Sequence, residues 1–345
     1  MEKIDDETWT QVLTQYFSEK NWELKPVPGG LNNLTRFVNT PNETFVVRIY
    51  QNGYGIEKVK YEIETLRRLH SILFSFQTPK VFLSLKGEDF VVTPNGNQAV
   101  MFTLISGHLP DETNLKHIKE FGRAAGELTT GWKDLKIDMP CPTFPYYELY
   151  KIHPLVPNKE TLQKSITSPV FNKMTEQADF LYEEIMKLEG AFESYHKILP
   201  KQNLHGDLWM GNCLIENDKI TAILDFEFAS IDWRALEVAI CVARFALAEN
   251  PWECFEAFLQ GFSQTCSLLE EEIQAIPALI KLRTLTNVIH FIGRYIEGLD
   301  SEEDVTKRLQ NYFKRIGWIN DNEGKIVDIF KTYLLNKEKQ NEKSL

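Results

Sequence analysis

The sequence feature that most constrains the fold of this chain is the spacing of three polar residues, Asp207, Asn212 and Asp225. The segment Leu204–Asn212, LHGDLWMGN, has the pattern H-x-D-x-x-x-x-N, and Asp225 follows about a dozen residues later at the end of an apolar stretch. The intervening residues indicate a strand, a tight turn and a second strand. One loop therefore turns Asp207 and Asn212 toward the same side, and the strand pair returns Asp225 to a place beside Asn212.

Two carboxylates and an amide at this separation suit the transfer of a phosphoryl group. One carboxylate accepts or orients the proton of an attacking hydroxyl, which is the role expected for Asp207. An amide oxygen and a second carboxylate, from Asn212 and Asp225, can hold Mg²⁺ on phosphate oxygens. The alternative interpretation is a loop with a helix-capping aspartate and a buried histidine. That interpretation does not explain why the motif occurs together with the strand pair before Asp225 and with the strands of the N-terminal part.

Strand and helix patterns divide the chain into two parts. After one leading helix, residues 1–104 are rich in strand patterns, whereas residues 105–345 are mostly helical with a short β insert. We therefore predict an α+β fold with a small β-rich N-terminal lobe and a larger, mostly helical C-terminal lobe. The stretch 132–169, rich in Pro and Tyr, shows no clear pattern. Strands are expected at Thr35–Thr40, Thr44–Tyr50, Lys80–Leu85, Phe90–Thr93, Gln98–Ile105, Asn203–Leu204, Cys213–Ile215 and Lys219–Leu224, and helices at Ile56–Phe74, Asn114–Thr130, Phe171–Leu188 and in about five pieces after Arg234.

Composition narrows the partners of the chain. With 345 residues and a net charge of −11, the protein repels phosphate backbones and anionic lipid surfaces, so we expect neither nucleic acid nor membrane partners. The five cysteines form no C-x-x-C pair and are interpreted as reduced thiols of a cytoplasmic protein. We expect no signal peptide and no membrane-spanning helix, because no stretch approaches 18 consecutive apolar residues.

Several motifs together resemble one known family. The segment from His205 to Asn212 followed by Asp225-Phe226 is similar to the catalytic and metal-binding segments of the aminoglycoside phosphotransferase/choline kinase family, which has a protein-kinase-like fold. Within that family, type II homoserine kinases and their relatives are most similar. The resemblance covers roughly Pro26 to Phe245 and includes Gly30–Asn33, Val46–Tyr50, Glu62–Leu69, Met101–Leu104 and Ser106-Gly107.

The resemblance implies a role for each matching residue. Asp207 would be the catalytic base, Asn212 and Asp225 would bind Mg²⁺, and ATP would be the phosphate donor. The residues implied to bind the nucleotide are Gly29, Gly30 and Asn33 in a loop over the phosphates, Arg48 on the third strand, Glu62 on the following helix, and Phe102 and Leu104 at the hinge between the lobes.

Two positions depart from the protein-kinase pattern. Arg48 stands where protein kinases carry lysine, and its forked guanidinium can still bind phosphate oxygens; the alternative is a surface arginine. Either Glu62 or Glu64 would orient Arg48, and the helical pattern does not separate them. Glu227 follows Asp225-Phe226 where protein kinases have glycine, so it either contacts a second metal ion or is solvated or ion-paired.

Two further residues near the motif are expected to be structural. In this fold the histidine of the motif commonly braces the loop, which is the role expected for His205. Asp232 resembles the acidic residue that caps a helix and ties down the catalytic loop in the family, and a plain helix cap is the alternative.

The acceptor side is less clearly marked. In the helix Lys281–Tyr295, four polar residues recur on one face, which would suit an acceptor that carries a carboxylate. A solvated face is the alternative. Tyr146 and Tyr147 either cover the substrate or fill the core. The four polar residues are Arg283, Asn287, His290 and Arg294.

We therefore predict a small-molecule kinase that uses ATP and Mg²⁺, with a hydroxylated amino acid or amino alcohol such as homoserine as acceptor. The alternatives are an aminoglycoside-modifying phosphotransferase, a catalytically silent nucleotide-binding module, and a metal-dependent hydrolase that uses His205 and Asp207 as ligands. The sequence leaves open the identity of the acceptor, the choice between ATP and GTP, and the oligomeric state.

Overall fold

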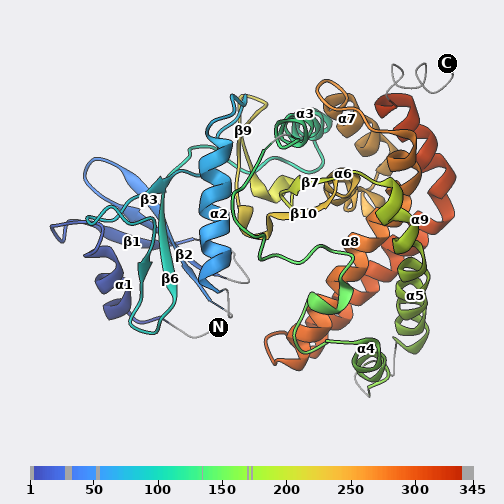
Figure 1. Ribbon diagram of the computed structural model, residues 1–345, viewed down its shortest axis with the longest axis horizontal. Helices are drawn as coiled ribbons and strands as arrows, with labels where there is room; N and C mark the ends of the chain where they lie inside the picture. The colour runs from blue at the N-terminus through green and yellow to red at the C-terminus, as the bar shows by residue number, and fades with distance from the viewer. Residues whose placement is uncertain are drawn as a thin grey trace.

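The chain folds into two lobes (Figure 1). The computed structural model describes residues 4–27, 33–51, 55–133, 135–168, 171 and 174–335. An antiparallel sheet with two helices forms the N-terminal lobe, and long helices with two short strand pairs form the C-terminal lobe. The predicted α+β fold with a small β-rich lobe and a larger helical lobe is confirmed. The boundary between residues 104 and 105 stays a prediction.

The N-terminal sheet has the strand order β1-β2-β3-β6-β4, and β5 pairs with β6. Helix α1 lies on one side of the sheet, and α2 lies between the sheet and the C-terminal lobe (Figure 1). The elements are α1 (Asp6–Leu13), β1 (Glu23–Pro26), β2 (Asn33–Asn39), β3 (Thr44–Tyr50), α2 (Ile56–Leu69), β4 (Val81–Phe82), β5 (Val91–Val92) and β6 (Gln98–Thr103).

Side-chain alternation along β3 orients the two faces of this sheet. Phe45, Val47 and Ile49 are buried in a small core that also contains Trp9 of α1. Because successive side chains of a strand point to opposite faces, Arg48 lies on the other face, the one that faces α2 and the C-terminal lobe. The hydrophobic pattern of β3 therefore aims one cation at the junction of the lobes.

The C-terminal lobe packs seven α-helices of its described residues around two strand pairs. Strand β7 pairs with β10 and β8 pairs with β9. The elements are α3 (Leu115–Gly131), α4 (Lys159–Ile166), α5 (Thr175–Ile198), β7 (Lys201–Leu204), β8 (Cys213–Glu216), β9 (Lys219–Ile223), β10 (Ser230–Trp233), α6 (Arg234–Val242), α7 (Pro251–Phe262), α8 (Glu270–Ile296) and α9 (Glu302–Leu334).

Helix α8 is the central helix of this lobe. It contacts α6, α5 and α9, and among the described residues it is the only helix long and apolar enough to cross a membrane. Within that apolar stretch 72% of the residues are buried inside the protein. We therefore assign α8 to the core of the lobe.

Two predicted helix boundaries are wrong, and each error has a local cause. The helix expected over Ile56–Phe74 ends at Leu69, because the backbone of Gln77 pairs with β9 and the chain must be extended there. The helix expected to end at Leu188 continues to Ile198. It stops there because Leu199 precedes Pro200 and adopts an extended conformation.

Candidate active site

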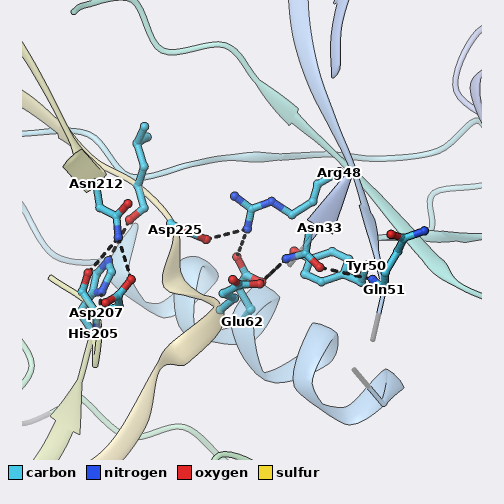
Figure 2. Close-up of polar contacts among 11 residues, drawn as sticks. Asn33, Arg48, Tyr50, Gln51, Glu62, His205, Asp207, Asn212 and Asp225 are labelled. Atoms are coloured by element: carbon cyan, nitrogen blue, oxygen red, sulfur yellow. Dashed lines mark hydrogen bonds and ion pairs between the residues drawn. The ribbon is translucent and has the colours of Figure 1, made fainter. Parts of the chain in front are cut away.

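The loop after β7 is shaped by a glycine. Gly206 has a φ of +79°, and a Cβ at this position would lie 2.4 Å from the carbonyl oxygen of Phe228. Only glycine fits this backbone conformation and this close approach. The loop then continues through a 3₁₀ turn at Met210–Asn212 into β8, so Asp207 and Asn212 both lie at the junction of the lobes (Figure 2).

The backbone fixes the orientation of the Asn212 side chain. Its Nδ2 donates to the carbonyl oxygen of Asp207 at 2.8 Å, and a carbonyl oxygen can only accept. The Oδ1 of Asn212 therefore stays available as a ligand. The backbone N–H of Leu224 donates to the carbonyl of Asn212 at 2.8 Å, which holds the end of β9 beside it.

Asp225 follows this contact in the left-handed region, with φ 66° and ψ 63°. The β8–β9 hairpin that carries it turns at Asn217 and Asp218, both with positive φ, as two-residue hairpin turns require. This turn is where the sequence predicts it. The hairpin returns the chain beside Asn212 through Leu224, and the carboxylate of the next residue, Asp225, points toward Arg48 (Figure 2).

His205 supports the loop by contacts with the segment around Asp225. It is fully buried, its Nε2 donates to the carbonyl oxygen of Leu224 at 2.8 Å, and its ring packs against Phe226 with centroids 4.6 Å apart. Burial lowers its pKa, so the ring is neutral. The expected bracing role agrees with this geometry.

Asp207 is held by a cation from the helical lobe. Its Oδ1 accepts a hydrogen bond from Nη2 of Arg283 in α8. Burial raises the pKa of Asp207, and the charge of Arg283 opposes that rise. A raised pKa makes the Asp207 carboxylate a stronger base than a solvated aspartate, as acceptance of a proton requires.

Arg48 lies between two carboxylates (Figure 2). Its Nη1 is 2.9 Å from Asp225 and 3.5 Å from Glu62. Glu62 also accepts a hydrogen bond from the hydroxyl of Tyr50 at 2.7 Å, and burial raises its pKa to about 7. Glu64 instead pairs with Arg67 and Arg68 on the surface side of α2. The geometry thus favours Glu62 as the partner of Arg48.

Glu227 is neither solvated nor ion-paired in the described structure. It is 7% exposed and accepts a hydrogen bond from Nδ2 of Asn33. Burial and the neighbouring Asp225 raise its pKa to about 8. Asn33 thereby links the start of β2 to the segment after Asp225. Gly29 and Gly30 lie outside the described residues.

The two hinge residues lie at the end of β6 and just beyond it. Phe102 is 6% exposed, and its ring centroid is 5.9 Å from the guanidinium carbon of Arg48. Leu104 is 41% exposed, and its backbone N–H donates to the carbonyl of Thr44. Their contact with a nucleotide stays a prediction.

The four polar residues predicted on α8 have different surroundings. Arg283 and Asn287 line a cavity of about 190 Å³ beside Asp207. His290 lies against His153, with ring centroids 5.9 Å apart, and burial lowers its pKa to about 3. Arg294 is 6% exposed and forms a bidentate pair with Asp300 at 2.9 and 3.0 Å. The stripe is therefore divided between a cavity and buried structural contacts.

Three residues support the loop around Asp207, and one of them, Glu237, could not be identified from a motif. Glu237 of α6 is buried and accepts the backbone N–H of His205. Asp232 does not cap α6, whose N-cap residue is Trp233. It accepts instead the backbone N–H of Tyr146 at 2.7 Å, and the hydroxyl of Tyr146 donates to the carbonyl of Gly206 at 2.6 Å. Asp232 therefore supports the loop through Tyr146.

This fold and this site define a small-molecule kinase. The chain belongs to the phosphotransferase enzyme family, whose sequence profile matches residues 23–274. The family resemblance predicted from the sequence is thus confirmed.

Individual relatives are distant but cover most of the chain. A homoserine kinase of Rhodopseudomonas palustris is 24% identical over 312 residues, which are 82% of this chain and 85% of that protein. The structure of a microcompartment-associated aminopropanol kinase superposes with a TM-score of 0.69 at 17% identity, over 94% of this chain and 99% of that one. The amicoumacin kinase hAmiN, in complex with AMP-PNP, Ca²⁺ and its substrate, superposes with a TM-score of 0.67 at 16% identity, over 91% and 93%.

Proposed function

We propose that this protein transfers the γ-phosphate of ATP to a hydroxyl group of a small metabolite, with Asp207 as the catalytic base. One observation carries the proposal. The Asp207 carboxylate lies between the Asn212–Asp225 pair on one side and a cavity in the helical lobe on the other. A phosphate donor on the first side and an acceptor on the second would meet at Asp207.

The residues on the nucleotide side fit a hard divalent cation. Mg²⁺ is usually held by one or two protein oxygens together with substrate phosphates, and the Oδ1 of Asn212 and the carboxylate of Asp225 supply such oxygens. A bound Mg²⁺ would neutralise charge on the β- and γ-phosphates. Arg48, oriented by Glu62, would bind α- and β-phosphate oxygens.

The chemical step then follows from the position of Asp207. The acceptor oxygen attacks the γ-phosphorus while its proton passes to the Asp207 carboxylate. The bond between the γ-phosphorus and the bridging oxygen breaks, and ADP leaves with that electron pair. Arg283 holds Asp207 in place, and its charge opposes the rise in the pKa of that carboxyl that burial causes. The loop at 29–33 would cover the phosphates, with Asn33 anchored on Glu227.

The names of the relatives suggest the first acceptors to test. Homoserine and aminopropanol are small hydroxyl compounds, and both fit a cavity of about 190 Å³ better than an aminoglycoside does. An aminoglycoside also carries several positive charges, so the arginines that line this cavity would repel it more strongly than they repel a compound with a single ammonium group. We therefore favour a small metabolite over an antibiotic as acceptor.

The test is acceptor-dependent formation of ADP by the purified full-length protein, with Asp207→Asn beside it. Loss of a general base lowers kcat by about 10²- to 10⁴-fold, and nucleotide binding should persist. Asp218→Asn is the matched control, since Asp218 is an exposed aspartate in the turn of the β8–β9 hairpin, which follows the loop of Asp207. An Asp207→Asn variant as active as the parent would refute the assigned role. Nucleotide binding without any acceptor-stimulated turnover would favour a silent binding module.

A further inference from the structure

The cavity beside Asp207 belongs entirely to the helical lobe. It is built by the loop after β7, the end of α6 and the facing sides of α8 and α9. Its volume of about 190 Å³ equals the space of about six water molecules at 30 Å³ each. The lining residues are Asp207, Trp209, Ile240, Ala243, Arg244, Arg283, Asn287, Arg308, Asn311, Tyr312 and Arg315.

Positive charge dominates this cavity. Four arginines line it against one carboxylate, that of Asp207, in a chain whose net charge is −11. Within the described part of the chain, Arg283 is the one of the four that forms an ion pair, and its partner is Asp207 itself. The other three, Arg244, Arg308 and Arg315, converge on the cavity with no carboxylate within ion-pair distance among the residues described.

Aromatic rings lie beside all three of these arginines. The guanidinium carbon of Arg244 lies 3.8 Å from the ring centroid of Trp209, that of Arg308 lies 4.0 Å from the ring of Phe291, and that of Arg315 lies 5.8 Å from the ring of Tyr312. Stacking on a ring positions a planar guanidinium without neutralising its charge. The N–H groups at its edge remain able to bind an anion. This support differs from the carboxylate pairs that hold Arg48 and Arg294 elsewhere in the protein.

Two buried donors in the cavity wall are unsatisfied. The Nε atoms of Arg308 and Arg315 are buried and have no hydrogen-bond partner among the described residues. Burial, with the charges of Arg244 and Arg283 added, lowers the pKa of Arg315 to about 10. Buried donors of like charge gathered in one place are unfavourable unless an anion joins them.

We propose that the acceptor carries at least two negative charges beside its hydroxyl, as a phosphate ester or as two carboxylates, and that Arg244, Arg308 and Arg315 bind them. This inference rests on the proposed kinase function. The hydroxyl of the same molecule points at Asp207, gives it its proton and forms the new bond to the γ-phosphorus, and ADP leaves as above. The product is a phosphate ester that carries the added phosphoryl group together with its original anionic groups.

The charge balance separates this class from zwitterionic acceptors. An ammonium group in the cavity would meet three arginines, and the one carboxylate there is already bound by Arg283. A larger cavity of about 620 Å³ lies between α5, α8 and α9, but it is lined by residues such as Glu184, Lys281 and Glu323 that pair with one another. It does not contain Asp207, so we place the acceptor in the smaller one.

The test compares acceptors of similar size and different charge. With Mg²⁺-ATP and the full-length protein, we would measure kcat/KM for glycerol and ethanolamine, for homoserine and glycerate, and for malate and glycerol 3-phosphate. The proposal expects the last two compounds to exceed the neutral and cationic ones by at least about 100-fold, as two hydrogen bonds to charged groups provide. Malate against glycerol 3-phosphate distinguishes two carboxylates from a phosphate.

Variants then locate the effect. Arg315→Met and Arg308→Met should each raise the KM of the best acceptor about 10- to 100-fold with kcat little changed, because they remove binding shared by ground and transition states. The KM for ATP should not change. Arg36→Met is the matched control, because Arg36 also lies over an aromatic ring, that of Trp9, but in the N-terminal lobe.

Binding of inorganic phosphate, measured by calorimetry, provides a readout that needs no turnover. Neutral or ammonium acceptors that match the dianions would overturn the proposal while the kinase function stands. The proposal would also be overturned if phosphate bound the parent and Arg315→Met with equal affinity. Failure of phosphate to bind the parent would overturn it as well. Conversely, phosphate binding that Arg315→Met abolishes in a protein that binds no nucleotide would support the anion site and refute the kinase function.

Discussion

The buried carboxyl of Glu237 makes the stability of this protein depend on pH near neutrality. Glu237 is 2% exposed and accepts the backbone N–H of His205 in the catalytic loop. Burial raises its pKa from 4.5 to about 8. Because the folded pKa is the higher one, the stabilisation is full below pH 4.5 and is lost as the pH rises through 8.

The magnitude follows from these two values. At pH 6 the folded carboxyl is almost fully protonated and at pH 8 about half, whereas the unfolded carboxyl is ionised at both. The linkage relation then gives a loss of about 2 kcal/mol in the free energy of unfolding between pH 6 and pH 8. Glu237→Gln keeps an oxygen that can accept the His205 N–H but does not titrate, so it should remove this part of the pH dependence.

Urea unfolding at pH 6 and pH 8 gives the change in the free energy of unfolding between the two pH values. The effect of Glu237 is the difference between this change in the parent and in Glu237→Gln. Other carboxyls with raised pKa, such as Asp232, titrate in both proteins and cancel. Glu253→Gln, at an exposed position in the first turn of α7, should leave the pH dependence unchanged. Glu237→Ala should destabilise at both pH values by about 1–3 kcal/mol, since it leaves a buried N–H unpaired. If Glu237→Gln and the parent lose the same stability between pH 6 and pH 8, the carboxyl is not protonated in the fold and the reasoning fails.

Three further substitutions separate roles that the sequence left open. Glu62→Gln should raise the KM for ATP several-fold, because it weakens the orientation of Arg48. Glu64→Gln should leave the KM for ATP unchanged and alter the free energy of unfolding by less than about 1 kcal/mol. Steady-state kinetics measure both KM values, and a larger effect of Glu64→Gln would contradict the assignment. Arg294→Met should lower the free energy of unfolding by about 3–5 kcal/mol because it leaves the buried Asp300 unpaired. The acceptor KM of the folded fraction should not change, and a rise would restore Arg294 as a substrate residue.

The nucleotide side of the site follows closely from local sequence. Asp207, Asn212 and Asp225 are brought together by one loop and one hairpin, so the distance between them along the chain is short. The glycine at 206 and the turn residues at 217 and 218 carry the backbone angles that this path needs. Alternation along β3 likewise predicts the face of Arg48 without any knowledge of distant contacts.

The acceptor side depends on packing between distant segments. Arg308 and Arg315 come from α9, where a spacing of seven residues places them on one face, but Arg244 comes from the segment after α6, and nothing in the sequence shows that it meets them. The four polar residues predicted on one face of α8 extend over a greater length than one small cavity, and helical periodicity alone does not show this. From Arg283 to Arg294 the helix rises about 16 Å at 1.5 Å per residue, which is too long for a cavity of about 190 Å³.

The charges on the two sides of Asp207 suggest why the site keeps them apart. On the nucleotide side, Asp225 and Glu62 contact one arginine, and burial raises the pKa of Glu62 and of the nearby Glu227. A divalent cation that arrives with the phosphate donor would favour the ionised forms of these carboxyl groups. On the other side, arginines outnumber the single carboxylate, which suits an acceptor that brings its own negative charge. Asp207 forms its ion pair among the described residues with Arg283, on the arginine side. An anionic acceptor that binds there would draw on the same positive charge that lowers the pKa of Asp207, so its arrival would make that carboxylate a stronger base at the moment when the proton must move.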